Sequence, residues 1–103
     1  MIYFVGAGAG DPELITLKGC RLLQQAHLVI YAGSLVNPKL LDHCTEGARI
    51  ENSAQMDLDT MVNLMVAADN KGETVVRLHT GDPSLYGATG EQMARLQQVV
   101  VHF

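Results

Sequence analysis

Short apolar runs alternate along this chain with segments that have helical periodicity. Strands are expected at residues 2–5, 28–31, 49–51, 74–78 and 99–103. The fourth of them is rich in β-branched threonine and valine, which favour extended backbone. Gly6, Gly33 and Gly81 follow three of these runs closely, as expected where a strand ends in a turn.

Helices are expected at residues 17–26, 38–43, 57–71 and 87–97. The third has the clearest pattern, because its apolar residues recur at a spacing of three and four. This single stripe is formed by Leu58, Met61, Val62, Met65 and Val66, so the methionines are interpreted as core residues. Asp11 or Thr16 can cap the first helix, Ser53 or Asp57 can cap the third, and Gly72 closes the third.

The alternation of strands and helices predicts an α/β fold, with a mostly parallel five-stranded sheet and helices on both faces. A length of 103 residues fits one such domain. Ligands of parallel α/β sheets bind beyond the carboxyl ends of the strands. The segments that follow the first, second and fourth strands are therefore the places to look for chemistry.

Charge and composition narrow the classes of partner. Seven basic and eleven acidic residues give a net charge of −4, which argues against a nucleic acid or another polyphosphate. Aromatic residues make up 5% and tryptophan is absent, so a base-stacking surface is not expected. No apolar run approaches the roughly 20 residues of a membrane span, and no signal peptide is evident. Two cysteines without a CxxC pattern favour a reduced, cytoplasmic protein.

The segment after the first strand reads Gly6-Ala7-Gly8-Ala9-Gly10-Asp11-Pro12. Its position suits a dinucleotide-binding loop, but its spacing does not, because Asp11 stands where the third glycine of GxGxxG would pack. The acid that should follow the second strand is also missing, so NAD is a poor expectation. A P-loop is excluded because no GKS or GKT follows. Taken alone, the glycines are equally well explained by a tight turn.

The other two segments are small and polar. Gly33 and Ser34 can present backbone N–H groups to a ligand, although their spacing alone favours a plain turn between a strand and a helix. In the segment from His79 to Gly87, Asp82 can accept hydrogen bonds from hydroxyl groups, and Tyr86 can pack on a flat ring. A capping turn before a helix is the equal alternative there.

Metal and hydrolase chemistry have little support. His43 and Cys44 are adjacent and do not easily face one ion, and no third ligand accompanies His79 and Asp82. There is no GxSxG motif, and Ser34 and Ser84 have no evident histidine partner. No metal is therefore expected.

Taken together, the three segments resemble the tetrapyrrole methylases. The run from Gly6 to Gly19 is similar to the opening signature of that family, which moves methyl groups from S-adenosyl-L-methionine to tetrapyrrole precursors. Three further runs resemble one branch of the family, which methylates C11 of precorrin-4 or cobalt-precorrin-4 in cobalamin biosynthesis. They are Tyr31 to Val36, His79 to Gly87 and Glu91-Gln92-Met93. The resemblance extends from residue 2 to about residue 97.

The resemblance implies roles for particular residues. The cofactor would contact Thr80, Gly81 and Asp82, largely through their backbone, with Leu85 packed beside it and Ala9 standing where the family usually has proline. Gly8, Gly10, Asp11, Ser34 and Tyr86 would line the substrate site, and Asp11 is the candidate catalytic residue. Lys18, Arg77 and His79 are candidates to pair with substrate carboxylates, although a solvated surface position is the more ordinary expectation for each.

The resemblance also implies an arrangement larger than this chain. Residues 1–103 correspond to the N-terminal domain of a two-domain enzyme, whose second domain completes the cofactor pocket and much of a homodimer contact. Methyl transfer would be direct, with the protein positioning the two reactants and excluding water. Neither nucleic acid nor membrane is an expected partner. The alternative is a non-catalytic α/β binding or dimerisation module that retains the fold.

Overall fold

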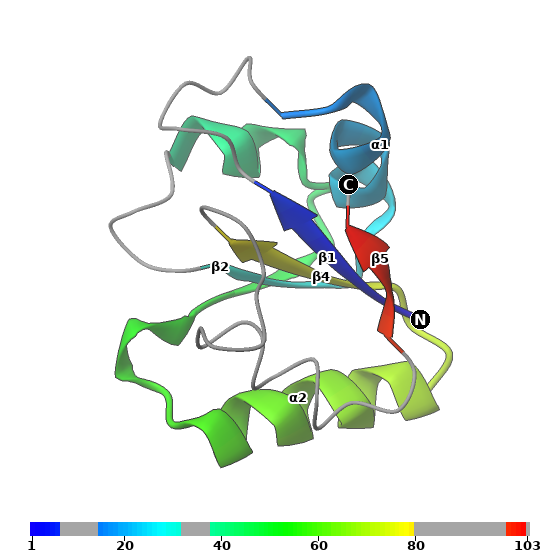
Figure 1. Ribbon diagram of the computed structural model, residues 1–103. Helices are drawn as coiled ribbons and strands as arrows, with labels where there is room; N and C mark the ends of the chain where they lie inside the picture. Colours follow the sequence, from blue (N-terminus) through cyan, green and yellow to red (C-terminus); the bar gives the residue numbers. More distant parts are fainter. Residues whose placement is uncertain (7–14, 32–37, 80–98, 103) are drawn as a thin grey trace.

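The computed structural model describes residues 1–6, 15–31 and 38–79, together with the backbone of residues 99–102. Five parallel strands form one sheet in the order β3-β2-β4-β1-β5. The strands are β1 (Ile2–Gly6), β2 (Leu28–Tyr31), β3 (Arg49–Asn52), β4 (Val75–His79) and β5 (Val99–His102). The expected α/β class and parallel sheet are confirmed (Figure 1).

Helices cover both faces of this sheet. α1 (Leu17–Gln25) and the 3₁₀ helix η3 (Pro38–His43) pack on one face, and α2 (Leu58–Asn70) packs on the other (Figure 1). A second 3₁₀ helix, η4 (Ser53–Gln55), joins β3 to α2. The segment expected to form a helix at residues 87–97 lies outside the described residues, as does Phe103.

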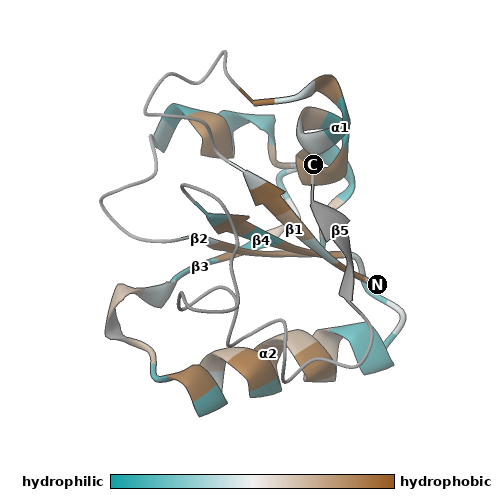
Figure 2. Cartoon of the chain, viewed as in Figure 1, coloured by the Kyte–Doolittle hydropathy of each residue, from teal (hydrophilic) through white to brown (hydrophobic). Residues whose placement is uncertain are grey.

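Two apolar clusters form the core, one on each side of the sheet. Successive strand residues alternate between them, so that Phe4 faces α2 while Val5 faces α1. Because β1 and β2 are buried on both faces, they are apolar almost throughout, whereas the equally buried β4 also contains Arg77 and His79. Figure 2 shows the apolar colour along β1 and hydrophilic colour towards the end of β4.

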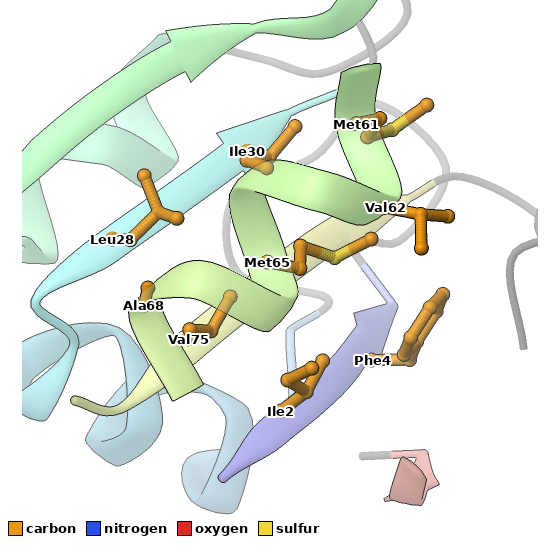
Figure 3. Packing of buried hydrophobic residues seen from close by; sticks show 9 residues of the cluster. All are labelled: Ile2, Phe4, Leu28, Ile30, Met61, Val62, Met65, Ala68 and Val75. Carbon is orange, nitrogen blue, oxygen red and sulfur yellow. The ribbon is translucent and has the colours of Figure 1, made fainter. Parts of the chain in front are cut away.

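The α2 face is packed by helix side chains against β1, β2 and β4 (Figure 3). Met61 and Met65 are buried there, which confirms their interpretation as core residues. Val66 is 38% exposed, however, so its assignment to the apolar stripe was wrong. At about 100° per residue, Val66 is turned well away from Met65. Ala68, three residues after Met65, is buried and continues the face of α2 that packs on the sheet.

Local signals set the limits of both α-helices. The Thr16 hydroxyl accepts a hydrogen bond from the Gly19 N–H at 2.9 Å, so Thr16 is the N-cap of α1. Asp57 caps α2 through the Thr60 N–H at 2.7 Å, and this bond lowers the pKa of the Asp57 carboxyl. Ser53, the other candidate cap, belongs to η4 instead. Gly72 follows α2 with a φ of +79°, a conformation that favours glycine.

Candidate functional site

Three neighbouring strands end at one edge of the sheet. In the order β2-β4-β1, Tyr31 lies beside Leu78 and His79 lies beside Gly6. Residues 7–14, 32–37 and 80–98 therefore all start from this row of strand ends, which we call the carboxyl edge. The sequence singled out these segments separately, and the sheet order brings their starting points together (Figure 1). This is the edge at which parallel α/β sheets bind ligands.

The candidate site residues themselves lie outside the described residues. They are Gly8, Ala9, Gly10, Asp11, Ser34, Thr80, Gly81, Asp82, Leu85 and Tyr86. Their roles remain predictions, and the structure bears on them through the described residues that flank them. Those flanks are the strand ends, the start of α1 and the buried side chains beneath the edge.

Arg77 was expected in a solvated position, and that expectation was wrong. It is only 5% exposed and lies on the α2 side of β4. Its Nη1 donates to the Leu78 carbonyl at 3.0 Å and to the Ile30 carbonyl at 3.3 Å. The strand is buried on both faces, so a charged residue at this position has to find its hydrogen bonds inside the protein.

His79 is also buried, with 3% of its surface exposed, so the expectation of a solvated position was wrong here too. Its ring lies against Phe4, with 6.4 Å between ring centroids and an interplanar angle of 45°. Lys18, the third residue considered as a partner for carboxylates, is exposed as expected. The last three residues of β4 thus include two buried polar side chains, Arg77 and His79, immediately before residue 80.

Ser53 adds a further bond at the carboxyl edge. Its hydroxyl donates to the Tyr31 carbonyl at 3.0 Å and so joins η4 to the end of β2. Together, Ser53 and Arg77 hold three carbonyl groups at the ends of β2 and β4, those of Ile30, Tyr31 and Leu78. Side chains thus reinforce this edge in addition to the bonds between strands.

Gly19 is a residue whose role the sequence analysis missed. A Cβ atom placed on it would lie 2.8 Å from Cγ1 of Val5 and 3.2 Å from Cγ1 of Ile15. The absence of a side chain therefore lets α1 approach β1 closely, next to the start of residues 7–14. A glycine in the first turn of a helix, on the side that faces the sheet, is the signal that could have identified it.

Cys44 carries a thiol, a potential nucleophile, and its surroundings shift the pKa of that thiol. It packs beside the cluster on the α1 face. Burial, and then the negative charge of Asp42, raise its pKa above the ordinary value. A raised pKa keeps the sulfur protonated at neutral pH, which makes Cys44 a poor nucleophile. Covalent catalysis by this thiol is therefore not favoured.

This property of Cys44 gives a direct prediction. In a Cys20→Ser variant, alkylation of Cys44 should rise with pH around a higher midpoint in the folded protein than in urea. Asp42→Asn should lower the folded midpoint only in part, because burial is the larger cause. Since the unfolded chain loses the thiol proton first, stability should fall as pH rises past the ordinary thiol pKa. Equal midpoints in the folded and unfolded protein would contradict the assignment.

A cavity lined by described residues lies at the opposite edge of the sheet. It has a volume of about 270 Å³ and is lined in part by His27, Arg49, Lys71 and Glu73. These residues surround the amino-terminal ends of β2 and β3, opposite the carboxyl edge. Within residues 1–6, 15–31 and 38–79, no group of three histidine, cysteine or acidic residues could hold a metal ion. No helix in the described part of the chain is long and apolar enough to cross a membrane.

A parallel α/β sheet whose three central strands end beside one another has the arrangement at which α/β domains commonly bind ligands. The sequence matches the family "Tetrapyrrole (Corrin/Porphyrin) Methylases" over residues 1–102. This chain therefore belongs to the tetrapyrrole methylase family, as its motifs indicated.

Several relatives support this assignment. A cobalt-precorrin-4 C(11)-methyltransferase of Methanocaldococcus jannaschii is 55% identical over 97 residues, which are 94% of this chain and 38% of that protein. A precorrin-4 C(11)-methyltransferase of Pseudomonas aeruginosa is 47% identical over 102 residues, covering 99% of this chain and 40% of the relative. The chain thus spans about two-fifths of the length of these curated relatives.

Solved structures agree with the sequence comparison. A cobalamin biosynthetic enzyme, cobalt precorrin-4 methyltransferase, superposes with a TM-score of 0.86 and 47% identity, over 96% of this chain and 44% of that one. Uroporphyrin-III C-methyl transferase from Thermus thermophilus, complexed with S-adenosyl homocysteine, gives a TM-score of 0.74 and 35% identity. That match covers 96% of this chain and 43% of the other.

Proposed function

We propose that this chain is the N-terminal α/β domain of a two-domain, S-adenosylmethionine-dependent C-methyltransferase. Its substrate would be precorrin-4 or cobalt-precorrin-4, methylated at C11 during cobalamin biosynthesis. The observation that carries this proposal is the 55% and 47% identity to proteins named for these two reactions. The three motif-bearing segments follow strands that end side by side at the carboxyl edge, which supports the same proposal.

The described residues fit a cofactor site at this edge. Gly6 ends β1 without a side chain, directly beside His79 at the end of β4. The segment that follows His79 contains Thr80, Gly81, Asp82 and Leu85, which would hold the cofactor through backbone groups and apolar contact. Ala9 belongs to the segment that follows β1, and β1 is the strand next to β4. Ala9 would therefore border the same site.

S-adenosylmethionine, when bound, supplies an electrophilic methyl group on a sulfonium centre. The segment that contains Thr80, Gly81, Asp82 and Leu85 would hold it, and it would give this methyl group directly to C11 of the ring, so the protein would need no nucleophile of its own. Its residues would position the two reactants. In reactions between two bound molecules, such positioning removes a large part of the activation free energy. Exclusion of water favours a step in which charge at sulfur is lost.

The substrate would lie against the segments that follow β1 and β2. Gly8, Gly10 and Ser34 would let the ring approach the backbone, and Tyr86 would pack on it. Asp11 would orient a pyrrole N–H or accept the proton that leaves the ring. We also propose that the enzyme works as a homodimer in the cytoplasm, where its free thiols Cys20 and Cys44 would stay reduced.

Calorimetric titration tests this function. S-adenosylhomocysteine is titrated into this chain and into a longer polypeptide that continues past Phe103. Binding that is at least tenfold tighter in the longer form supports a pocket completed by a second domain. Equal binding by both forms, without methyl transfer, would support a binding module instead. The absence of binding by either form would overturn the methyltransferase proposal.

A further inference from the structure

Arg77 carries hydrogen bonds that the sheet itself does not require. Its Nη1 group contacts one carbonyl on its own strand, at Leu78, and one on the neighbouring strand, at Ile30. In the sheet, Ile30 is the residue directly beside Arg77. One guanidinium nitrogen thus bridges β2 and β4, one or two residues before each strand ends.

The neighbours of Arg77 on the two adjacent strands are apolar. Its neighbours at the same level on this face of the sheet, Phe4 and Ile30, are both fully buried and belong to the cluster beneath α2. Burial lowers the pKa of the Arg77 guanidinium to about 10, because keeping a charge away from water has a cost in free energy. An apolar side chain of similar length would fill this position without that cost.

A costly polar residue inside a core points to a task other than stability. Arg77 lies where two of the three segments of the carboxyl edge begin, since residues 32–37 follow β2 and residues 80–98 follow β4. A guanidinium is planar and rigid, so its bonds to both carbonyls fix their separation and direction. A lysine has a single flexible nitrogen and would hold the two carbonyls less well.

We propose that Arg77 is a positioning residue, which sets the two strand ends so that the segments after β2 and β4 are correctly placed for methyl transfer. This inference rests on the proposed function and adds a residue to it that does not touch either reactant. Ser53 acts in the same direction from η4, through its bond to the Tyr31 carbonyl.

The test uses the complete two-domain enzyme that contains this sequence, with the variants Arg77→Met and Arg77→Lys. The control is Arg49→Met, which removes an exposed arginine that pairs with Glu51 on the edge strand β3. Arg77→Met should keep or raise the melting temperature and lower kcat/KM about ten- to a hundredfold, the effect expected of a small misplacement of reactants. Arg77→Lys should recover part of the loss, and Arg49→Met should match the parent enzyme.

A second measurement does not depend on methyl transfer. Amide hydrogen exchange, followed by mass spectrometry, should be faster in Arg77→Met for peptides from residues 28–37 and 75–86, and unchanged for α2. Unchanged exchange in those peptides, or an unchanged kcat/KM, would overturn the positioning role. A melting temperature that falls in step with activity would also overturn it, because Arg77 would then be purely structural. If the parent enzyme transfers no methyl group, the proposed function fails and hydrogen exchange alone decides the role of Arg77.

Discussion

Replacing Phe4 with alanine should lower the free energy of unfolding by about 3–5 kcal/mol, which is the usual cost of removing a fully buried phenylalanine. Phe4 has 0% exposure and lies in the cluster between β1 and α2. Its ring also packs against His79 at the end of β4. The substitution should therefore loosen both the core and the strand end that leads into residues 80–98.

Urea denaturation followed by circular dichroism measures this effect on the 103-residue chain. The urea concentration at the midpoint of unfolding should fall. The slope of the free energy of unfolding against urea concentration should stay the same, because unfolding exposes a similar surface area. Ile50→Ala is the matched control, since Ile50 is a strand residue that is 40% exposed. It should change stability by no more than about 0.5 kcal/mol. A loss of less than about 1 kcal/mol for Phe4→Ala would contradict the described core.

Replacing Gly19 with alanine should also destabilise the protein, although alanine favours helices. The new Cβ would lie 2.8 Å from Cγ1 of Val5, a contact that real side chains do not tolerate. Val5 is fully buried, so either α1 or β1 must shift. Overpacking costs about 1–3 kcal/mol and outweighs the gain of about 1 kcal/mol in helix propensity. The shift should also weaken S-adenosylhomocysteine binding, because residues 7–14 connect β1 to the approach of α1.

A double-mutant cycle isolates the cause. Val5→Ala removes the methyl group that the new Cβ would strike, so Gly19→Ala should cost much less in that background. Gly47→Ala is the control glycine, because no atom lies within 4 Å of its added Cβ. Additive effects of Val5→Ala and Gly19→Ala would show that the close approach is not the reason for the glycine.

The pattern of the sequence was sufficient for most elements, because each has a strong local signal. Leu28–Tyr31 is an apolar run, and Leu58–Asn70 has a stripe, a capping aspartate and a closing glycine. The motifs were also sufficient to identify the family. The order of strands in the sheet could not be predicted, because right-handed crossovers permit several orders. That order is what places β2, β4 and β1 side by side.

The errors at Arg77, His79 and Gly19 have a common physical cause. Arg77 and His79 were expected at the surface because charged and polar residues are usually found there. Their strand is buried on both faces, and tertiary packing overrode that tendency. Gly19 was missed for a similar reason, since its importance depends on the closeness of Val5, fourteen residues earlier in the chain. Interactions between distant segments are what local patterns do not contain.

The central claim is that this chain forms one side of a C11-methyltransferase site. The most direct test incubates the complete enzyme with S-adenosylmethionine bearing a ¹³C-labelled methyl group and with precorrin-4 or cobalt-precorrin-4. Mass spectrometry and ¹³C NMR of the product then locate the label. The label should appear at C11. Label at another ring carbon, or no labelled product with either substrate, would contradict the account.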